Sequence, residues 1–401
     1  MELMEGYKQT EVGIIPAIWD IKPLVECCKK ITDGTHDTPK KVEIGVPFIT
    51  AIHVKENNID FDSCYFLPEE VHRVIFNRCN PEKGDVLMVN IGAGVATTAL
   101  VSVDYEFSLK NVALIKPDTS KLIGKYLNYW QIFSKTKIVD SISSGGAQPF
   151  LSLNQIGGLI IALPAIAEQT AIATALNDAD ALITSLERLI EKKRAIKRGA
   201  MQQLLKPKEG WDVKKLGEIA EIVGGGTPST FIPHYWNGTI NWFTPTEIGA
   251  EKYSFESKRK ITKDGKLSCS AKILPIGTIL LTTRAGIGDA SILMQEGCTN
   301  QGFQSLIAKE GYHNEYLYYL ILTLKSVLLQ NASGSTFLEI SPNKIKQIDV
   351  SVPNYEVQTT IATVLSDIDL EITTLEKKLT KCKMLKQGMM QELLTGKIRI
   401  I

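Results

Sequence analysis

The residue types that carry most enzyme chemistry are present in this chain, but their spacing matches no catalytic motif. Two glycine clusters, at residues 92–94 and 224–226, are too short for a dinucleotide-binding or phosphate-loop fingerprint. No Pro-Pro dipeptide occurs, so the Pro-Pro-aromatic motif that an adenine methyltransferase holds against a flipped base is missing. The histidines are scattered and form no His-Glu-x-x-His pattern: His36, His53, His72, His234 and His313. We therefore predict no catalytic residues and no metal site.

Cysteine usage and charge limit the class of protein further. The seven cysteines are odd in number and contain no Cys-x-x-Cys pair, so neither a disulfide framework nor a zinc site is expected. This cysteine usage fits a reducing cytoplasm best. The first ten residues contain no apolar core and do not resemble a signal peptide. The net charge is +1, so any surface for a polyanion must be local.

The length of 401 residues exceeds what one hydrophobic core normally supports, and an internal repeat explains it. Residues 163–205 and 352–394 align without a gap at an offset of 189, with 20 of 43 positions identical. Upstream the similarity is weaker but keeps its order, with the offset drifting between about 187 and 194. Matched pairs there include Trp19 with Trp211, Gly34-Thr35 with Gly226-Thr227, and Phe150-Leu151 with Phe337-Leu338. The predicted order is module 1–160, helix 161–206, module 207–350 and helix 351–401.

The two well-matched segments predict long helices. Each follows a proline, Pro164 or Pro353, and continues for about 40 residues without another proline. Apolar residues recur in alternating steps of four and three, which is the heptad pattern of a coiled coil. We expect the two helices to pair antiparallel, although each helix could instead pack only on its own module. The apolar positions are Ile172, Leu176, Ala179, Ile183, Leu186 and Ile190 in the first copy, and Ile361, Leu365, Ile368, Ile372, Leu375, Leu379 and Cys382 in the second.

The modules between the helices have the pattern of mixed α/β domains. Short β-branched runs separated by Gly, Pro, Asn and Thr predict strands, for example at Val86–Val89, Val112–Ile115 and Ile279–Thr283. Helices are predicted at Tyr126–Ile138 and Glu315–Leu329. The segment from 86 to 103 carries no charge, but its Asn, Gly and Thr residues favour strand–turn–strand over a membrane span. No membrane association is expected.

The aromatic residues near the start of each module have two interpretations. Trp19 and Trp211 occupy equivalent places, and we expect them to be core anchors rather than platforms for a stacked base. Tyr235 and Trp236, beside His234, fit packing and nucleic-acid contact equally well. The sequences of the two modules have diverged, whereas those of the two helices have not. This fits two modules that recognise different targets, and it also fits two lobes of a structural protein.

Three motifs give the chain a resemblance to a known family. The opening residues 7–16 followed by Trp19, the doubled Gln-Thr-x-Ile-Ala-Thr helix starts, and the helix ends at 197–205 and 386–394 resemble specificity (S) subunits of type I restriction–modification systems. The resemblance covers essentially the whole chain. It implies α/β (α+β) target recognition domains in tandem, separated by two long helices that form an antiparallel coiled coil with a pseudo-two-fold internal repeat.

The resemblance also implies partners and a division of labour. Each target recognition domain would bind one half of a split double-stranded DNA site. Two modification subunits would methylate adenine with S-adenosylmethionine, so this chain would need no cofactor of its own, and restriction subunits would supply the nuclease. Inserting one helical turn, about 5.4 Å, should then lengthen the preferred gap by about one or two base pairs. The alternative is a coiled-coil assembly scaffold that binds only protein.

Base edges and phosphates are contacted by side chains with hydrogen-bond donors and acceptors, which gather in a few loops of each module. The DNA-binding candidates in the first module are Thr35, His36, Lys40, Lys41, Ser144 and Gln148. Those in the second module are Thr227, Ser229, Thr230, Thr283, Arg284, Asn300, Gln301, Gln304, Ser335 and Thr336. Each of them could instead be a turn residue that serves the backbone.

The starts of the two long helices predict a surface for partners. Gln169-Thr170 and Gln358-Thr359 are identical between the copies, and we expect them to face outward. Two identical modification subunits docking on two equivalent surfaces would explain this identity.

Overall fold

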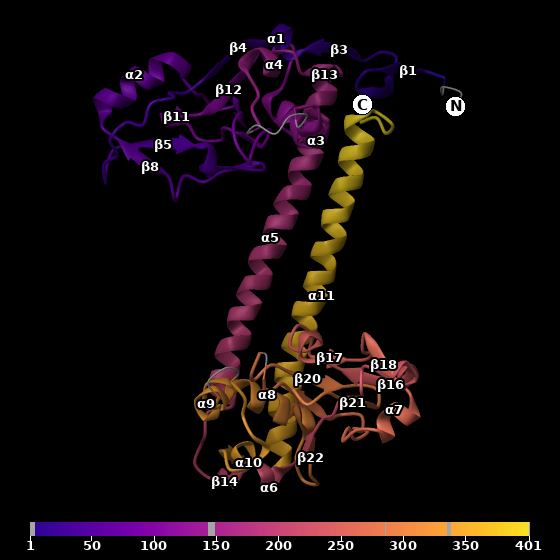
Figure 1. Cartoon of the computed structure of the whole chain (residues 1–401). Helices are drawn as coiled ribbons and strands as arrows, with labels where there is room; N and C mark the ends of the chain where they lie inside the picture. Colours follow the sequence, from indigo (N-terminus) through magenta and orange to yellow (C-terminus); the bar gives the residue numbers. More distant parts are fainter. Residues whose placement is uncertain (1–4, 143–148, 285, 335–337, 401) are drawn as a thin grey trace. The chain divides into compact units, whose positions relative to one another are not determined.

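The computed structural model describes residues 5–142, 149–284, 286–334 and 338–400, and it divides into two compact units (Figure 1). Unit 1 consists of Met1–Glu187 with Lys377–Ile401, and unit 2 consists of Arg188–Glu376. Each unit therefore combines one module with segments of both long helices. The first and last described segments of the chain meet in unit 1, where the Tyr7 hydroxyl donates to the Gly396 carbonyl at 3.0 Å.

The module of unit 1 is built on two small sheets. A four-stranded antiparallel sheet has the order β10-β9-β12-β4, with strands Thr98–Leu100, Val86–Val89, Val112–Pro117 and Cys28–Asp33. A three-stranded sheet has the order β11-β5-β8, with strands Ser108–Lys110, Val46–Thr50 and Tyr65–Leu67, the first pair parallel and the second antiparallel. A third pair joins β13, Ile160–Leu163, to β3, Asp20–Pro23.

Unit 2 repeats this topology. Its main sheet has the order β15-β22-β19-β20-β17, with strands Ala220–Gly224, Gln304–Ala308, Ile279–Leu281, Ala290–Leu293 and Tyr253–Ser254. Its three-stranded sheet has the order β18-β16-β21, with strands Arg259–Ile261, Trp236–Phe243 and Gly297–Thr299. β14, Asp212–Lys215, pairs with β23, Asp349–Val352. Strands β15, β22, β19 and β20 match β4, β12, β9 and β10 of unit 1 in order and direction, and the three-stranded sheets match as well, whereas β17 is an additional strand that pairs parallel with β20. The repeat therefore extends through the divergent modules.

Short elements complete the two modules. Unit 1 also contains β1 (Tyr7–Thr10), β2 (Gly13–Pro16), β6 (Val54–Lys55), β7 (Asn58–Ile59), α1 (Leu24–Cys27), η1 (Ala51–His53), α2 (Glu69–Cys79), α3 (Gly124–Ile142) and α4 (Leu153–Gly157). Unit 2 also contains α6 (Leu216–Ile219), η2 (Pro233–Tyr235), η3 (Pro245–Glu247), α7 (Lys263–Leu267), α8 (Asn314–Thr323), α9 (Lys325–Asn331) and α10 (Pro342–Lys346).

The predicted strands and the uncharged stretch agree with these elements. All four residues of β9 are buried, and β9 pairs antiparallel with β10, so the uncharged segment forms two strands of one sheet. Within the described residues, no helix is long and apolar enough to cross a membrane. The helix expected at Glu315–Leu329 is instead two helices, because the chain leaves helical geometry at Leu324 (φ −87°, ψ 3°). The second helix, α9, then buries Leu328 in the core of unit 2.

The long helices are α5, Ile166–Leu204, and α11, Tyr355–Leu394. They pack antiparallel within each unit, as the heptad pattern predicts. In unit 1, Lys383 of α11 pairs with Glu187 of α5 at 2.7 Å, and in unit 2 Arg194 of α5 pairs with Glu376 of α11 at 2.7 Å. These two ion pairs occupy equivalent positions of the repeat, since Glu187 corresponds to Glu376 and Arg194 to Lys383. The same contact between the two helices is therefore made once in each unit.

The two long helices pair with each other, and each also packs on a module, so both interpretations of the sequence apply together. In unit 1, Ile172 and Leu176 of α5 lie in the module core, and Leu393 and Leu394 of α11 lie in the same core. In unit 2, Ile361 of α11 and Leu205, just after α5, share the corresponding core. Each module therefore rests on the start of one long helix and the end of the other.

One detail of the sequence alignment is wrong. Ser152 and Ser341 cap α4 and α10, and they are related by the same offset as the two long helices. The Leu151 amide donates to the Asn90 carbonyl, and its equivalent, Ile340, donates to the Thr283 carbonyl. The offset of the helices thus holds here, so Phe150-Leu151 correspond to residues 339–340. The match with Phe337-Leu338 was a chance similarity out of register.

Candidate nucleic-acid interface

The loop that follows β4 in module 1 is held against the end of β11. Thr35 donates its amide to the Leu109 carbonyl at 2.9 Å and accepts the Asn111 amide at 3.2 Å. A Cβ on Gly34 would lie 2.0 Å from the Leu109 oxygen, so only glycine permits this approach. The Thr35 hydroxyl accepts the Asp37 amide, so this side chain shapes the loop.

The loop presents the other first-module candidates toward solvent. The exposed His36 ring contacts Asn111 Oδ1 at 2.9 Å through Nδ1 and Asp33 at 2.9 Å through Nε2. Lys40 and Lys41 are exposed, and the Lys41 ammonium lies 3.0 Å from the centre of the Tyr65 ring. Ser144 and Gln148 lie outside the described residues.

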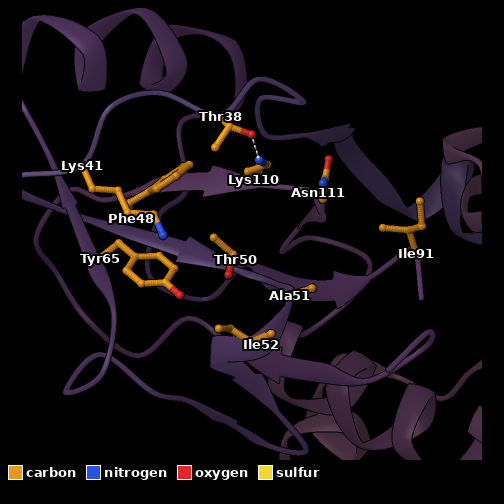
Figure 2. A pocket seen from close by; sticks show the side chains of 10 residues that line it. All are labelled: Thr38, Lys41, Phe48, Thr50, Ala51, Ile52, Tyr65, Ile91, Lys110 and Asn111. Atoms are coloured by element: carbon orange, nitrogen blue, oxygen red, sulfur yellow. Dashed lines mark hydrogen bonds between the residues drawn. The ribbon is translucent and has the colours of Figure 1, made fainter. Parts of the chain in front are cut away.

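A hollow of about 300 Å³ lies beside this loop, and Figure 2 shows its lining side chains. Lys110, at the end of β11, donates to the Thr38 hydroxyl, and both residues line the hollow. Sequence reasoning missed Lys110, Asn111 and Tyr65. Asn111 could have been found, because the offset of the repeat places it opposite Asn300, which is a candidate in module 2.

The corresponding loop of module 2 brings its candidates together in the same way. The Thr227 hydroxyl donates to Gln301 Oε1, which joins the loop after β15 to the turn after β21. The Trp242 indole donates to the Gly226 carbonyl at 2.9 Å, and the Trp236 indole donates to the Ser229 carbonyl at 3.1 Å. Thr227, Ser229, Thr230 and Gln301 are exposed. Asn300 accepts the Gly302 amide at 2.8 Å, so part of its side chain serves the turn.

Two second-module candidates are corrected by burial. The Thr283 side chain is fully buried, and its hydroxyl donates to the Gly302 carbonyl at 3.1 Å. Gln304 is 8% exposed, and its amide lies beside Gly224 on the neighbouring strand β15. Neither side chain faces outward. The neighbouring Arg284 is exposed and pairs with Glu339 at 3.0 Å, whereas Ser335 and Thr336 lie outside the described residues.

The aromatic residues pack inside their modules. Trp19 is buried and donates to Glu168 at 3.1 Å, and Trp211 packs against the core of unit 2, so the expected core role of both is confirmed. Trp236 is also buried, edge-on to Trp242, which settles its two interpretations in favour of packing. Tyr235 remains half-buried beside the exposed His234.

The model of the type I restriction modification DNA specificity domain matches residues 16–198 and again residues 208–382. The chain belongs to this family. As a specificity subunit it is a recognition subunit rather than a catalytic one. No group of three or more His, Cys, Asp or Glu side chains within the described residues could hold a metal ion.

Relatives span either part or all of this specificity subunit. The type I restriction enzyme MjaIX specificity subunit of Methanocaldococcus jannaschii is 45% identical over 41% of this chain and 38% of its own length. The putative MjaX specificity subunit of the same organism is 26% identical over 99% of this chain and 97% of its own. The S subunit structure from M. genitalium matches 98% of both chains at 14% identity with a TM-score of 0.63, which shows a shared fold.

Gln169 and Gln358 of this specificity subunit do not face outward as expected. Gln169 is fully buried: its Oε1 accepts the Ile123 amide at 2.9 Å, and its Nε2 donates to the carbonyls of Lys121 and Pro164 at 2.9 and 3.0 Å. Gln358 likewise accepts the His313 amide and donates to the Pro353 carbonyl, both at 2.9 Å. Their identity in the two copies therefore has an explanation within the chain, since each ties a long helix to its own module.

The neighbouring threonines differ from these glutamines. Thr170 is exposed and Thr359 is partly exposed, and each hydroxyl donates to the carbonyl one helical turn earlier, that of Ile166 or Tyr355. Their side chains remain at the surface, so a role in binding partners stays a prediction for these two residues.

A second matched cluster joins the module, its own helix and the partner helix. In unit 1, Asp180 of α5 accepts the Tyr129 hydroxyl at 2.7 Å and pairs with Lys386 of α11 at 2.6 Å. In unit 2 the equivalent residues are Asp369, Tyr319 and Lys197, with distances of 2.6 and 2.5 Å. Burial, followed by the hydrogen bond to the carboxylate, raises the pKa of Tyr129 and of Tyr319 well above its usual range. Both phenols therefore stay protonated donors.

Proposed function

We propose that this chain recognises a split double-stranded DNA site, with residues 1–160 binding one half and residues 207–350 the other. Two modification subunits that carry S-adenosylmethionine would methylate adenine in this site, and restriction subunits would cleave unmodified DNA, all in the cytoplasm. The observation that carries the proposal is a duplicated module whose equivalent loops bear different polar side chains.

The difference between the loops supports two distinct half-sites. Where module 1 places Lys110 at the end of β11, module 2 places Thr299 at the end of β21. Next to the loop after β15, module 2 offers the Thr227–Gln301 pair. Glutamine favours adenine N6 and N7 among the base edges, whereas a lysine ammonium also suits a backbone phosphate. A shared backbone with different donors and acceptors suits two readers of different sequences.

The exposed and partly exposed candidates make up the proposed DNA-contacting surface. They are Thr35, His36, Lys40 and Lys41 in module 1, and Thr227, Ser229, Thr230, Arg284, Asn300 and Gln301 in module 2. The helix pairs described above support the spacer role, because ion pairs and apolar contacts fix the register of α5 against α11 within each unit.

Methylome sequencing tests this proposal directly. A restriction-deficient host would carry this chain with its modification subunit, and the matched control host would carry the modification subunit alone. We expect methylated adenines in a motif of two short blocks separated by unspecified bases, and none in the control. A contiguous motif would contradict the split site. No methylation, together with no DNA binding by the assembled complex, would favour the protein-only scaffold.

A further inference from the structure

The hollow in module 1 is lined by several polar and cationic side chains. Its polar lining consists of Thr38, Lys41, Thr50, Lys110 and Asn111 together with the Tyr65 hydroxyl. Figure 2 shows these side chains around one space, with a dashed line for the hydrogen bond from Lys110 to Thr38. They come from the loop after β4, from β5, from β8 and from β11, so the tertiary fold brings them together.

The charge of the hollow is positive. Its lining, drawn from the described residues, includes two lysines and no Asp or Glu. Lys41 lies over the face of Tyr65, and Lys110 bonds to a neutral hydroxyl, so neither ammonium is paired with a carboxylate of the described chain. The nearby Asp33 is already shared by Arg78 at 2.6 Å and His36 at 2.9 Å. An anion entering the hollow would meet two cations and would not displace an existing ion pair.

The remaining lining specifies which anion fits. Asn111 Oδ1 contacts His36, which leaves the Asn111 NH₂ group to donate. Hydroxyl, amide and ammonium donors are the usual set for a DNA phosphate. The walls are apolar, formed by Phe48, Ala51, Ile52 and Ile91, and Ile52 is 60% exposed at the rim. The space is larger than one phosphate needs, and the apolar walls suit an adjoining sugar.

We propose that this hollow binds one backbone phosphate and its neighbouring deoxyribose in the half-site of module 1, with Lys110 and Lys41 as the phosphate ligands. The proposal rests on the proposed function and goes beyond it by assigning a sequence-independent anchor. Module 2 lacks the matching cation, because Thr299 stands at the position of Lys110. The anchor is therefore assigned to module 1.

The test measures the affinity of the full chain, assembled with its modification subunits, for a duplex carrying its methylated motif, between about 50 and 200 mM salt. Loss of one phosphate contact should reduce the slope of log K against log salt by about 0.9. We expect Lys110→Met to bind about tenfold more weakly, to show this smaller slope and to keep the same motif. Lys110→Arg should retain the slope, because the positive charge remains. Lys137→Met, on the exposed face of α3, is the matched control and should behave as the parent chain.

Replacing single DNA phosphates by a neutral analogue identifies the phosphate that Lys110 contacts. Methylphosphonate substitution, moved along the half-site of module 1, should weaken the parent complex at one position where Lys110→Met is insensitive. A slope unchanged in Lys110→Met and in Lys41→Met would overturn the proposal, and an altered motif would show base reading instead. Equal thermal stability and complex assembly of the variants exclude misfolding as the cause. Failure of the proposed function has a different signature, since the parent chain would then not bind the motif at all.

Discussion

Replacing Gln169 by methionine separates an internal role of this side chain from a role in docking. Methionine keeps the length and volume of glutamine but removes three hydrogen bonds, to the Ile123 amide and to the Lys121 and Pro164 carbonyls. One of these bonds is buried and two are half-buried, so water can replace only part of what is lost. At about 1 kcal/mol per bond, we expect a loss of about 2–3 kcal/mol in the free energy of unfolding of unit 1.

The matched variant Gln358→Met gives an internal comparison. Gln358 makes two such bonds, to the His313 amide and the Pro353 carbonyl, so its loss should cost about 2 kcal/mol or slightly less, in unit 2. Calorimetry of the purified chain should show Tm falling by about 2–4 °C per kcal/mol for units of this size, and more for Gln169→Met than for Gln358→Met. Because the chain has two units, the transition affected by each variant should differ.

Glutamate at the same position sharpens the test. Gln169→Glu keeps an acceptor for the Ile123 amide. Its second carboxylate oxygen, however, replaces the amide donor and faces two carbonyl oxygens in a fully buried site. We expect it to destabilise unit 1 more than methionine does. Unchanged Tm in all three variants, with loss of binding to the modification subunits, would refute this reasoning and restore the outward docking role.

Three further outcomes follow from the structure. A double-mutant cycle of Asp180→Asn with Lys386→Met should give a coupling energy of about 1–2 kcal/mol in unfolding experiments. The cycle of Asp369→Asn with Lys197→Met should give a similar value. Coupling energies near zero would show that these ion pairs do not stabilise the packing of α5 against α11. Burial holds the pKa of several tyrosines above the pKa of tyrosine in the unfolded chain. Their contribution to stability is therefore complete below about pH 10 and declines above it, so the free energy of chemical unfolding should fall from there. Constant stability up to about pH 11 would contradict this. The tyrosines concerned are Tyr126, Tyr129, Tyr253, Tyr316, Tyr318 and Tyr319. Adding one helical turn to both long helices should lengthen the methylated motif by about one or two unspecified base pairs, and an unchanged spacer would count against the helices as a ruler.

Local patterns in the sequence were sufficient for the long helices and for the repeat. Heptad spacing depends only on which residues share a helix face, so α5 and α11, their start after Pro164 and Pro353 and their antiparallel pairing were all predictable. The core roles of Trp19 and Trp211 followed from their repeated position. The break at Leu324 was not predictable, because the apolar periodicity continues across it and core packing of Leu328 favours a change of direction.

The orientation of polar side chains was decided by the tertiary structure. Gln169, Gln358, Thr283 and Gln304 are polar in sequence and buried in the fold, where backbone groups or a neighbouring strand meet them. A sequence records which donors and acceptors a side chain carries, but its partners come from segments that are distant along the chain. The hollow shows the converse, since Lys41 and Lys110 are far apart in the sequence and line one space only because β5 pairs with β8 and β11. The sequence by itself therefore determined the duplication, the helices and the family, whereas the buried anchors and the cationic hollow were decided by long-range packing that no local pattern records.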